Sequence, residues 1–415
     1  MKVIIAGAGI GGLAAAIALQ RKGIDVRVFE QVAQIRALGV GINLLPHAVG
    51  VLSSLGLADA LAAVAIPTRE VAFMNRHGQH ILADARGLAA GYEFPQYSIH
   101  RGELQMLLLD AASAAIGADN IRTGHKIASF EQKDGKVVAR FIDRESGAPL
   151  GEETADVLIA ADGIHSTVRA HFYPDEGPPK WNGVQMWRGV TEGKPFLTGR
   201  SQIWSGWNRQ KFVAYPISRK LENEGRALIN WIADLRLDQT EMPRREDWNR
   251  PGKLEDFLPR FESWVWPFFN VPEVIRNAQA IYEFPMVDRD PLPRWSHGRV
   301  TLLGDAAHPM YPIGSNGASQ AVLDAEAIAD CLSALPDPEA ALREYESRRL
   351  PMAASIVNMN RKQGIDVILD IVEERAPGGF TNLDDVVPRA ELEAIVARYK
   401  QVAGHRQNPG TGKPA

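Results

Sequence analysis

Three glycines and one acid near the N-terminus are spaced as a dinucleotide-binding turn requires. Gly7, Gly9 and Gly12 follow a short apolar run, and Glu30 ends the next apolar run. In such a turn the first glycine permits a sharp bend, the second lets the backbone approach a pyrophosphate, and the third lets a helix pack on the strand. A carboxylate at the position of Glu30 accepts hydrogen bonds from an adenosine ribose and disfavours a 2′-phosphate. These residues predict a site for NAD or FAD rather than NADP.

Two further acids follow apolar, strand-forming runs later in the chain. Asp162 ends the run 156–161, and Asp305 ends the run 299–304. Ligands of open α/β sheets bind beyond the carboxyl ends of the strands, so both acids are expected at the edge that holds the glycine turn. The carboxylate of Asp305 suits the hydroxyls of a ribityl chain. Asp162 fits a ligand contact or the cap of a following helix, and the two roles can coexist.

The pattern of apolar residues predicts the elements that hold these groups. A strand, a helix ending near Lys22 and a second strand form a βαβ unit, and a strand followed by a helix returns after residue 298. Between them, residues 181–282 are typical of alternating strands in an antiparallel sheet with one aromatic face. Two segments of a nucleotide-binding domain are therefore expected to flank a β-rich insert.

Four shorter segments are also assigned from the sequence. Residues 39–43 are expected to form a loop, residues 46–55 a helix, and residues 98–101 the start of another helix. Residues 154–160 are expected to form one strand that runs into the Asp-Gly turn.

Composition restricts the possible classes of protein. A chain of 415 residues suggests two domains. The net charge of −4, with both signs interspersed, indicates no nucleic-acid partner. The single cysteine, Cys331, excludes an internal disulfide framework and a cysteine-based metal site, so a reducing cytoplasm is expected. No motif of a hydrolase, zinc protease or kinase occurs, no metal ligand set is predicted, and no membrane partner is expected.

Taken together, the motifs resemble the FAD-dependent, single-component aromatic hydroxylases, the class typified by p-hydroxybenzoate and salicylate hydroxylases. The glycine turn, the Asp-Gly segment 156–169 and the Gly-Asp segment 302–309 occur in the family's order, and the resemblance covers nearly the whole chain. Segments 38–43, 95–106 and 285–293 are most similar to the phenazine hydroxylases of the 5-methylphenazine-1-carboxylate 1-monooxygenase type.

The resemblance implies an α/β fold: a Rossmann-like FAD-binding domain of the glutathione-reductase type, an inserted antiparallel β-sheet substrate domain, and C-terminal helices. The expected divisions are an FAD-binding domain of residues 1–72, 97–180 and 283–360, a substrate domain of residues 73–96 and 181–282, a C-terminal helical segment of residues 361–403, and a disordered tail of residues 404–415.

The resemblance also implies roles for individual residues. Glu30 holds the adenosine ribose, Arg101 contacts the pyrophosphate or ribityl region of the flavin, and Asp305 holds the ribityl hydroxyls. Asp162 and Arg169 belong to a motif that serves both FAD and the nicotinamide donor, although Arg169 also fits an ion pair at a helix end. FAD is expected to be non-covalent, with NADH or NADPH as a transient electron donor.

The segment from Pro309 to Gly317 is expected to surround the flavin ring. Prolines stiffen it, glycines admit the ring, and a helix begins at its end, so the backbone around Gly314, Asn316 and Gly317 would face the ring and stabilise its reduced anion. On the opposite side, the glycine-rich stretch around Val40 is expected to form a movable wall.

Few side chains take part in the chemistry that the resemblance implies. NADH or NADPH reduces FAD, dioxygen forms a flavin C4a-hydroperoxide, and one oxygen passes to an electron-rich aromatic or N-heteroaromatic ring. Pro312, His308 and Tyr215 are the candidate catalytic residues. His308 fits a packed, hydrogen-bonded wall better than a base, and Tyr215 fits either the substrate pocket or the core of the sheet.

The sequence thus favours an FAD monooxygenase that acts on a phenazine- or hydroxybenzoate-like substrate. Its expected partners are a small aromatic substrate, dioxygen and NAD(P)H, and the protein is expected to be a monomer or homodimer. An FAD-dependent dehydrogenase or reductase without oxygen transfer, and a nucleotide-binding module without turnover, remain alternatives.

Overall fold

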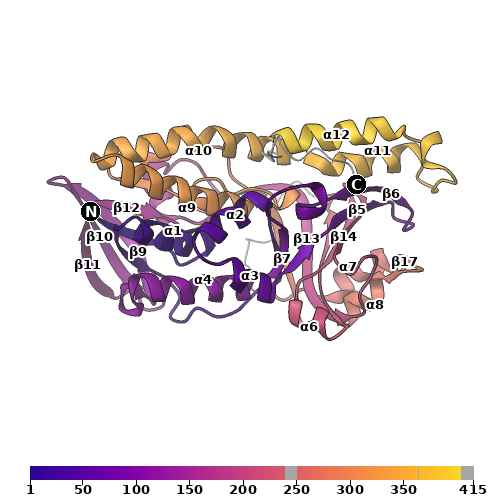
Figure 1. The fold of residues 1–415 in the computed structure, drawn as a ribbon, viewed down its shortest axis with the longest axis horizontal. Coiled ribbons are helices and arrows are strands. Elements are labelled where there is room, and N and C mark those ends of the chain that lie inside the picture. The colour runs from indigo at the N-terminus through magenta and orange to yellow at the C-terminus, as the bar shows by residue number, and fades with distance from the viewer. Residues whose placement is uncertain (239–249, 363, 403–415) are drawn as a thin grey trace.

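Two large sheets with helices packed on them form the molecule (Figure 1). The computed structural model describes residues 1–238, 250–362 and 364–402. In Figure 1 the parallel sheet and its helices lie on the left and the second sheet on the right, while the long helix α10 (Pro338–Arg361) runs along the upper edge toward α11 and α12. This confirms the predicted α/β architecture with a second, β-rich sheet and C-terminal helices.

The first sheet carries the predicted βαβ unit at its centre. Its strands, in spatial order, are β20 (Ser296–His297), β21 (Val300–Leu302), β12 (Val157–Ala160), β1 (Lys2–Ala6), β2 (Asp25–Phe29) and β8 (Ile121–Arg122). All neighbours are parallel except β20 and β21. Helix α1 (Ile10–Arg21) is buried from Gly11 to Leu19 and packs against both α4 (Arg101–Ile116) and α9 (Gly317–Ala334). Its Ala- and Ile-rich sequence is apolar on every face, as a helix inside a layered domain requires.

The second sheet is antiparallel apart from one parallel pair, β14 with β5. In spatial order its strands are β19 (Ile281–Asp288), β13 (Lys180–Gly193), β16 (Ala227–Arg236), β15 (Gln210–Pro216), β14 (Ser201–Trp207), β5 (Glu70–Met74) and β6 (His80–Ala85). Helices α7 (Leu254–Phe261) and α8 (Val271–Arg276) cover one face with an aromatic cluster that includes Phe212, Trp231 and Phe257. Helices α11 (Val367–Arg375) and α12 (Arg389–Val402) cover part of the other face. The predicted aromatic face is thus confirmed.

Smaller elements lie outside the two large sheets. They are the strands β3 (Gly41–Leu44), β4 (Ile66–Thr68) and β7 (Gln96–His100), the meander β9 (His125–Lys133), β10 (Lys136–Asp143) and β11 (Pro149–Ala155), the hairpin β17 (Val265–Trp266) and β18 (Phe269–Asn270), and the helices α2 (Pro46–Ser54), α3 (Ala58–Val64), α5 (Thr167–Phe172) and α6 (Arg219–Asn223). Helix α2 agrees with the predicted helix over residues 46–55.

Three local predictions were wrong in part. The expected loop 39–43 becomes strand β3 from Gly41 onward, and the expected helix start at residues 98–101 is strand β7, with the helix beginning only at Arg101. Both strands pair with each other across more than fifty residues of sequence, which local patterns do not show. The expected single strand 154–160 is two strands in different sheets, divided at Asp156, whose carboxylate accepts a hydrogen bond from the Lys2 N–H.

The division into domains remains a prediction. Strand β19 crosses the boundary that was expected between residues 282 and 283. The expected disordered tail, residues 404–415, lies outside the described residues. Among the helices that the structure describes, none combines the length and the apolar character needed to cross a bilayer.

Candidate cofactor and substrate site

Of the three motif glycines in the turn after β1, only one has space beside it for a side chain or a ligand. A Cβ on Gly7, which has φ +110°, would lie 2.3 Å from the Ala161 carbonyl oxygen, and a Cβ on Gly12 would lie 2.0 Å from the Gly7 oxygen. A Cβ on Gly9 would meet no atom within 4 Å. Gly7 and Gly12 therefore permit close packing of strand and helix, whereas Gly9 borders open space at the N-terminus of α1, where amide groups attract a phosphate.

Glu30 lies beside this turn, directly after β2. Its Oε2 accepts a hydrogen bond of 2.8 Å from the Ala8 N–H, and its Oε1 accepts one of 2.9 Å from the Val32 N–H. An ionised carboxylate has about four acceptor positions, so these two bonds orient Glu30 and leave capacity for ribose hydroxyls.

Asp305 follows β21 at the carboxyl edge of the same sheet. Its side chain is exposed, yet surrounding protein removes enough water to raise the pKa of the carboxyl, against the opposing charges of His308 and Arg101. Arg101 is exposed at the first position of α4. The carboxyl of Asp305 and the guanidinium of Arg101 thus lie close enough to interact electrostatically. A carboxylate suits the ribityl hydroxyls of a flavin nucleotide, and a guanidinium suits its pyrophosphate.

Asp162 combines the two roles proposed for it in part. Its Oδ2 accepts a hydrogen bond of 2.8 Å from the Thr167 N–H at the start of α5. Its Oδ1 is buried and accepts no hydrogen bond from the described residues, and burial raises the pKa of this carboxyl. The N-cap residue of α5 is Ser166, whose Oγ accepts a hydrogen bond from the Arg169 N–H. Asp162 therefore supports the first turn of α5 without being its N-cap, and one of its oxygens remains for a ligand.

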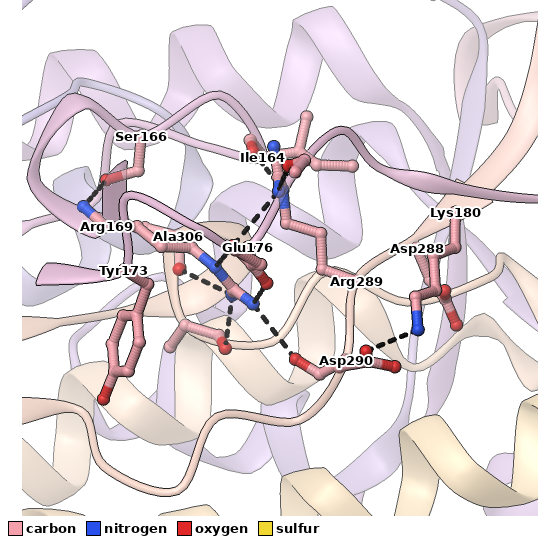
Figure 2. A network of polar contacts seen from close by, with 12 residues as sticks. Ile164, Ser166, Arg169, Tyr173, Glu176, Lys180, Asp288, Arg289, Asp290 and Ala306 are labelled. Atoms are coloured by element: carbon pink, nitrogen blue, oxygen red, sulfur yellow. Dashed lines mark hydrogen bonds and ion pairs between the residues drawn. The ribbon is translucent and has the colours of Figure 1, made fainter. Parts of the chain in front are cut away.

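Arg169 on α5 is 1% exposed, and all five of its N–H groups are used within the protein (Figure 2). Nε and Nη2 form a bidentate pair with Glu176, Nη1 donates to the carbonyls of Ala306 (3.1 Å) and Ala307 (3.0 Å), and Nη2 also donates to the Asp290 carbonyl (3.0 Å). These contacts favour the ion-pair alternative over direct cofactor binding. Arg169 instead fixes the backbone directly after Asp305.

A cavity of about 260 Å³ opens beside this network. Ser166, Tyr173 and Arg289 contribute to its lining together with Arg169 and Glu176. Arg289 donates to the carbonyls of Ile164 (3.0 Å) and Gly177 (2.8 Å) and to Glu176 (3.1 Å), and Figure 2 shows its guanidinium close to Ile164 and Glu176. A cationic pocket therefore adjoins the Asp-Gly motif.

The loop expected to surround the flavin has an unusual backbone. Gly314 has φ +70° and Ser315 has φ +61°, so two consecutive residues are left-handed immediately before Asn316 and the start of α9 at Gly317. Asn316 is buried, whereas a Cβ on Gly317 would meet nothing within 4 Å. Pro312 is exposed, with φ −73°. Open space thus lies at the N-terminus of α9, as the predicted contact with the ring requires.

The wall around Val40 is held more firmly than expected. Val40 is buried, and its carbonyl accepts a hydrogen bond of 2.9 Å from the Arg101 N–H. The Gly41 N–H donates to Asn230 Oδ1 (2.6 Å), and the Gly41 carbonyl accepts from Arg188 Nη2 (2.8 Å). Because Asn230 and Arg188 belong to the second sheet, these hydrogen bonds tie the stretch to that sheet from Gly41 onward, and its mobility stays a prediction.

His308 is 2% exposed and lies in a buried ionic cluster. Its Nε2 lies 2.6 Å from Asp324 Oδ2, and Asp324 also accepts hydrogen bonds from the Arg349 Nε (2.7 Å) and the Gly304 N–H (3.1 Å). Burial would raise the pKa of Asp324, but His308 and Arg349 outweigh it and lower the pKa to about 2. This environment favours the packed wall over a proton carrier.

Tyr215 lies on β15 and is 3% exposed. Burial raises the pKa of its hydroxyl to about 12, although Arg188 and Asn43 interact with it and act in the opposite direction. Tyr215 therefore stays protonated near neutral pH. It belongs, with Val40 and Trp204, to the cluster on the face of the second sheet that α11 and α12 partly cover, rather than to the aromatic core beneath α7 and α8.

Sequence reasoning missed Arg188, Asn43 and Asp324. Arg188 had a usable signal, because it is a lone cation at an inward position of the alternating run that contains Met186 and Val190. Asp324 had one as well, because at helical spacing it falls on the same apolar stripe as Ala321, Ile328 and Cys331. Within the described residues, no group of three His, Cys, Asp or Glu side chains is placed to bind a metal ion.

Comparison with known proteins identifies relatives over nearly the whole length. The model of the family described as FAD binding domain matches residues 1–250 and 273–360. Phenazine 1,6-dicarboxylic acid hydroxylase of Lysobacter antibioticus is 43% identical over 402 residues, 96% of each chain. A 3-amino-4-hydroxybenzoate 2-monooxygenase of Streptomyces platensis is 33% identical over 88% of this chain and 87% of its own. Among solved structures, Klebsiella pneumoniae HpxO complexed with FAD and uric acid has a TM-score of 0.74 and 27% identity, covering 97% of this chain and 93% of that one.

Proposed function

This chain belongs to the FAD-dependent aromatic hydroxylases that carry the FAD binding domain, and from that premise we propose that it hydroxylates a planar, electron-rich aromatic or N-heteroaromatic substrate with NAD(P)H and dioxygen. The observation that carries the proposal is the 43% identity to a phenazine dicarboxylate hydroxylase over 96% of both chains. The names of other relatives, which act on hydroxybenzoates and hydroxynicotinate, support the same substrate class.

The residues at the edge of the parallel sheet fit FAD. In this proposal Glu30 binds the adenosine ribose, the open side of Gly9 faces the pyrophosphate, and Arg101 and Asp305 bind the region between pyrophosphate and ring. When bound, FAD supplies the redox chemistry, by accepting a hydride from the nicotinamide donor and activating dioxygen. The protein's own task is to orient the substrate and to exclude water.

An apolar cluster between the flavin loop and the second sheet supports an aromatic substrate. Tyr311 and Ile313 of the loop pack with Met186, Phe284 and Met286 of the sheet. Arg188 lies beside this cluster, with its guanidinium carbon 5.5 Å from the Phe284 ring centre. We propose that the substrate ring lies near this apolar surface, with the polar side chains of Arg188 and Tyr215 at its border.

The decisive experiment measures turnover and oxygen transfer together. Purified protein is screened with phenazine carboxylates, hydroxybenzoates and hydroxynicotinates for stimulated oxidation of NADH and NADPH. The mass of each product is then measured by mass spectrometry after reaction under ¹⁸O₂. One ¹⁸O atom per product supports the hydroxylase. Substrate-dependent NAD(P)H oxidation without ¹⁸O incorporation supports the dehydrogenase alternative. Acid precipitation should release all flavin, since FAD is proposed to be non-covalent.

The proposal also covers the cellular location and the oligomeric state of the protein. A cytoplasmic location is supported by the single cysteine, Cys331, which is buried in α9. A monomer or homodimer is proposed, and light scattering of the purified protein distinguishes the two.

The cationic pocket beside the Asp-Gly motif is proposed to bind the phosphates of the nicotinamide donor. We predict that Arg289→Ala raises the KM for NAD(P)H by about tenfold with little change in kcat, because one charge-assisted hydrogen bond is lost. Arg343→Ala on α10, where the arginine is exposed, is the matched control and should leave KM unchanged. An unchanged donor KM in a folded Arg289→Ala protein with normal FAD content would contradict this assignment.

Pro312 is proposed to stiffen the loop that keeps water from the reacting atoms. Pro312→Gly should loosen this loop without touching the distant adenosine contacts. We expect near-normal FAD content, continued substrate-dependent NAD(P)H oxidation and at least a twofold larger share of electrons released as hydrogen peroxide. If Pro312 only stabilises a turn, the melting temperature and all activities fall together while the peroxide share stays constant.

A further inference from the structure

Ser315 has an unfavourable backbone conformation at the centre of the flavin loop. Its φ of +61° lies in the left-handed region, which residues other than glycine adopt only at a cost. Asp134 and Leu197 are the other described non-glycine residues with positive φ. Such a conformation persists only where surrounding contacts hold it, so the partner of Ser315 determines the shape of this loop.

That partner is Asn43 of strand β3. Its Nδ2 donates a hydrogen bond of 3.1 Å to Ser315 Oγ, and its Oδ1 accepts hydrogen bonds from Ser98 Oγ (2.6 Å) and Gln202 Nε2 (2.9 Å). Asn43 is 5% exposed. Hydrogen-bond partners on three different elements thus fix one buried amide, which also interacts with the Tyr215 hydroxyl and cannot rotate without leaving polar groups unpaired.

The direction of these hydrogen bonds is set from the second sheet. The indole Nε1 of Trp204 can only donate, and it donates to Gln202 Oε1 at 3.3 Å. The amide nitrogen of Gln202 must therefore face Asn43 Oδ1, which in turn directs the Asn43 nitrogen toward Ser315. Trp204 belongs to β14 and lies in one apolar cluster with Tyr215 and Val40.

We propose that Asn43 is a positioning residue, which couples the inner face of the substrate sheet to the flavin loop by holding Ser315 in its left-handed conformation. This inference rests on the proposed function in one respect, that the loop faces FAD. The hydrogen-bond chain runs from Trp204 through Gln202 and Asn43 to Ser315. It sets the direction of the backbone amides that follow, at Asn316 and Gly317.

The test compares two single variants with their combination. In Asn43→Ala, Ser315 loses its partner and relaxes, so amide hydrogen exchange in a peptide covering residues 309–317 should rise at least fivefold. Glycine adopts positive φ without the penalty. Ser315→Gly in the Asn43→Ala background should therefore restore at least half of the change, whereas Ser315→Gly alone should have little effect. Thr68→Val, which alters the same polar cluster through Ser98 and Gln202 without contacting Asn43 or Ser315, is the matched control.

A second measurement connects the loop to catalysis. The share of electrons lost as hydrogen peroxide should rise at least threefold in Asn43→Ala and fall again in the double variant, while Thr68→Val lowers the melting temperature only. Unchanged exchange in Asn43→Ala, or a change that Ser315→Gly does not reverse, would overturn the positioning role. Hydrogen exchange does not depend on turnover. If the proposed function fails, the unaltered enzyme transfers no oxygen, yet the exchange experiment still tests the positioning role of Asn43.

Discussion

Replacing Asp305 by alanine is expected to weaken FAD binding by about tenfold to hundredfold, and Glu30→Ala should have an effect of similar size. Each removes a charge-assisted hydrogen bond worth roughly 1.5 to 3 kcal/mol. The dissociation constant is measured by quenching of flavin fluorescence on titrating the apoprotein.

The two variants should differ in the stability of the apoprotein. Glu30 accepts hydrogen bonds from the backbone of Ala8 and Val32, so Glu30→Ala also loosens the glycine turn. Asp305 is a partly desolvated acid that accepts no hydrogen bond from the residues described here, so its removal should not lower the melting temperature of the apoprotein. Asp175→Ala, at an exposed position, is the control. FAD affinity that is unchanged in both folded variants would refute the cofactor assignment.

Asp324→Ala is expected to cost about 3 to 5 kcal/mol of unfolding free energy, because it leaves the buried cation of Arg349 without its carboxylate. The matched control lies on the same helix. Asp330 pairs with Lys22 at 2.7 Å, but both side chains are about half exposed, so Asp330→Ala should cost less than about 1 kcal/mol. Urea unfolding of the three proteins measures both values, and equal losses would show that the buried cluster has no special role.

The same cluster predicts a pH dependence. The pKa of Asp324 is about 2 in the folded protein and about 3.9 in an unfolded chain. Its contribution to stability is therefore fully present above about pH 4 and is lost as the pH falls toward 2. Relative to Asp324→Asn, the unaltered protein should lose about 2 kcal/mol over this interval. A difference that does not vary with pH would contradict the shifted pKa.

The sequence was sufficient where local geometry depends on neighbours in the chain. The turn at Gly7, Gly9 and Gly12 and the acid at Asp305 are local motifs, because one strand and the residues after it determine their geometry. The strand β7 was mistaken for a helix start, since its pairing with β3 joins residues such as Ile42 and Ile99 that are far apart in sequence.

Side-chain roles that depend on several distant segments were the hardest to predict. The partners of Arg169 come from residues 176, 290, 306 and 307, so no local pattern reveals that its N–H groups are fully used. Likewise, Asn43 binds Ser98, Gln202 and Ser315, each on a different element. The sequence indicated which strand ends carry the candidate site, whereas long-range packing determines which side chains already have hydrogen-bond partners within the protein.

The strand order of the parallel sheet has a consequence for how the protein is made. Strand β1 lies beside β12, and β12 lies beside β21, which follows β2 by about 270 residues from Phe29 to Val300. At roughly 5 to 20 residues per second, the ribosome needs about 15 to 55 s to supply that last parallel strand. Throughout this interval the growing parallel sheet has an unpaired, apolar strand at its edge, which is β1 at first and β12 once residues 157–160 have been made. Production should therefore improve with chaperone co-expression or slower synthesis, whereas extra flavin can act only once the chain is nearly complete.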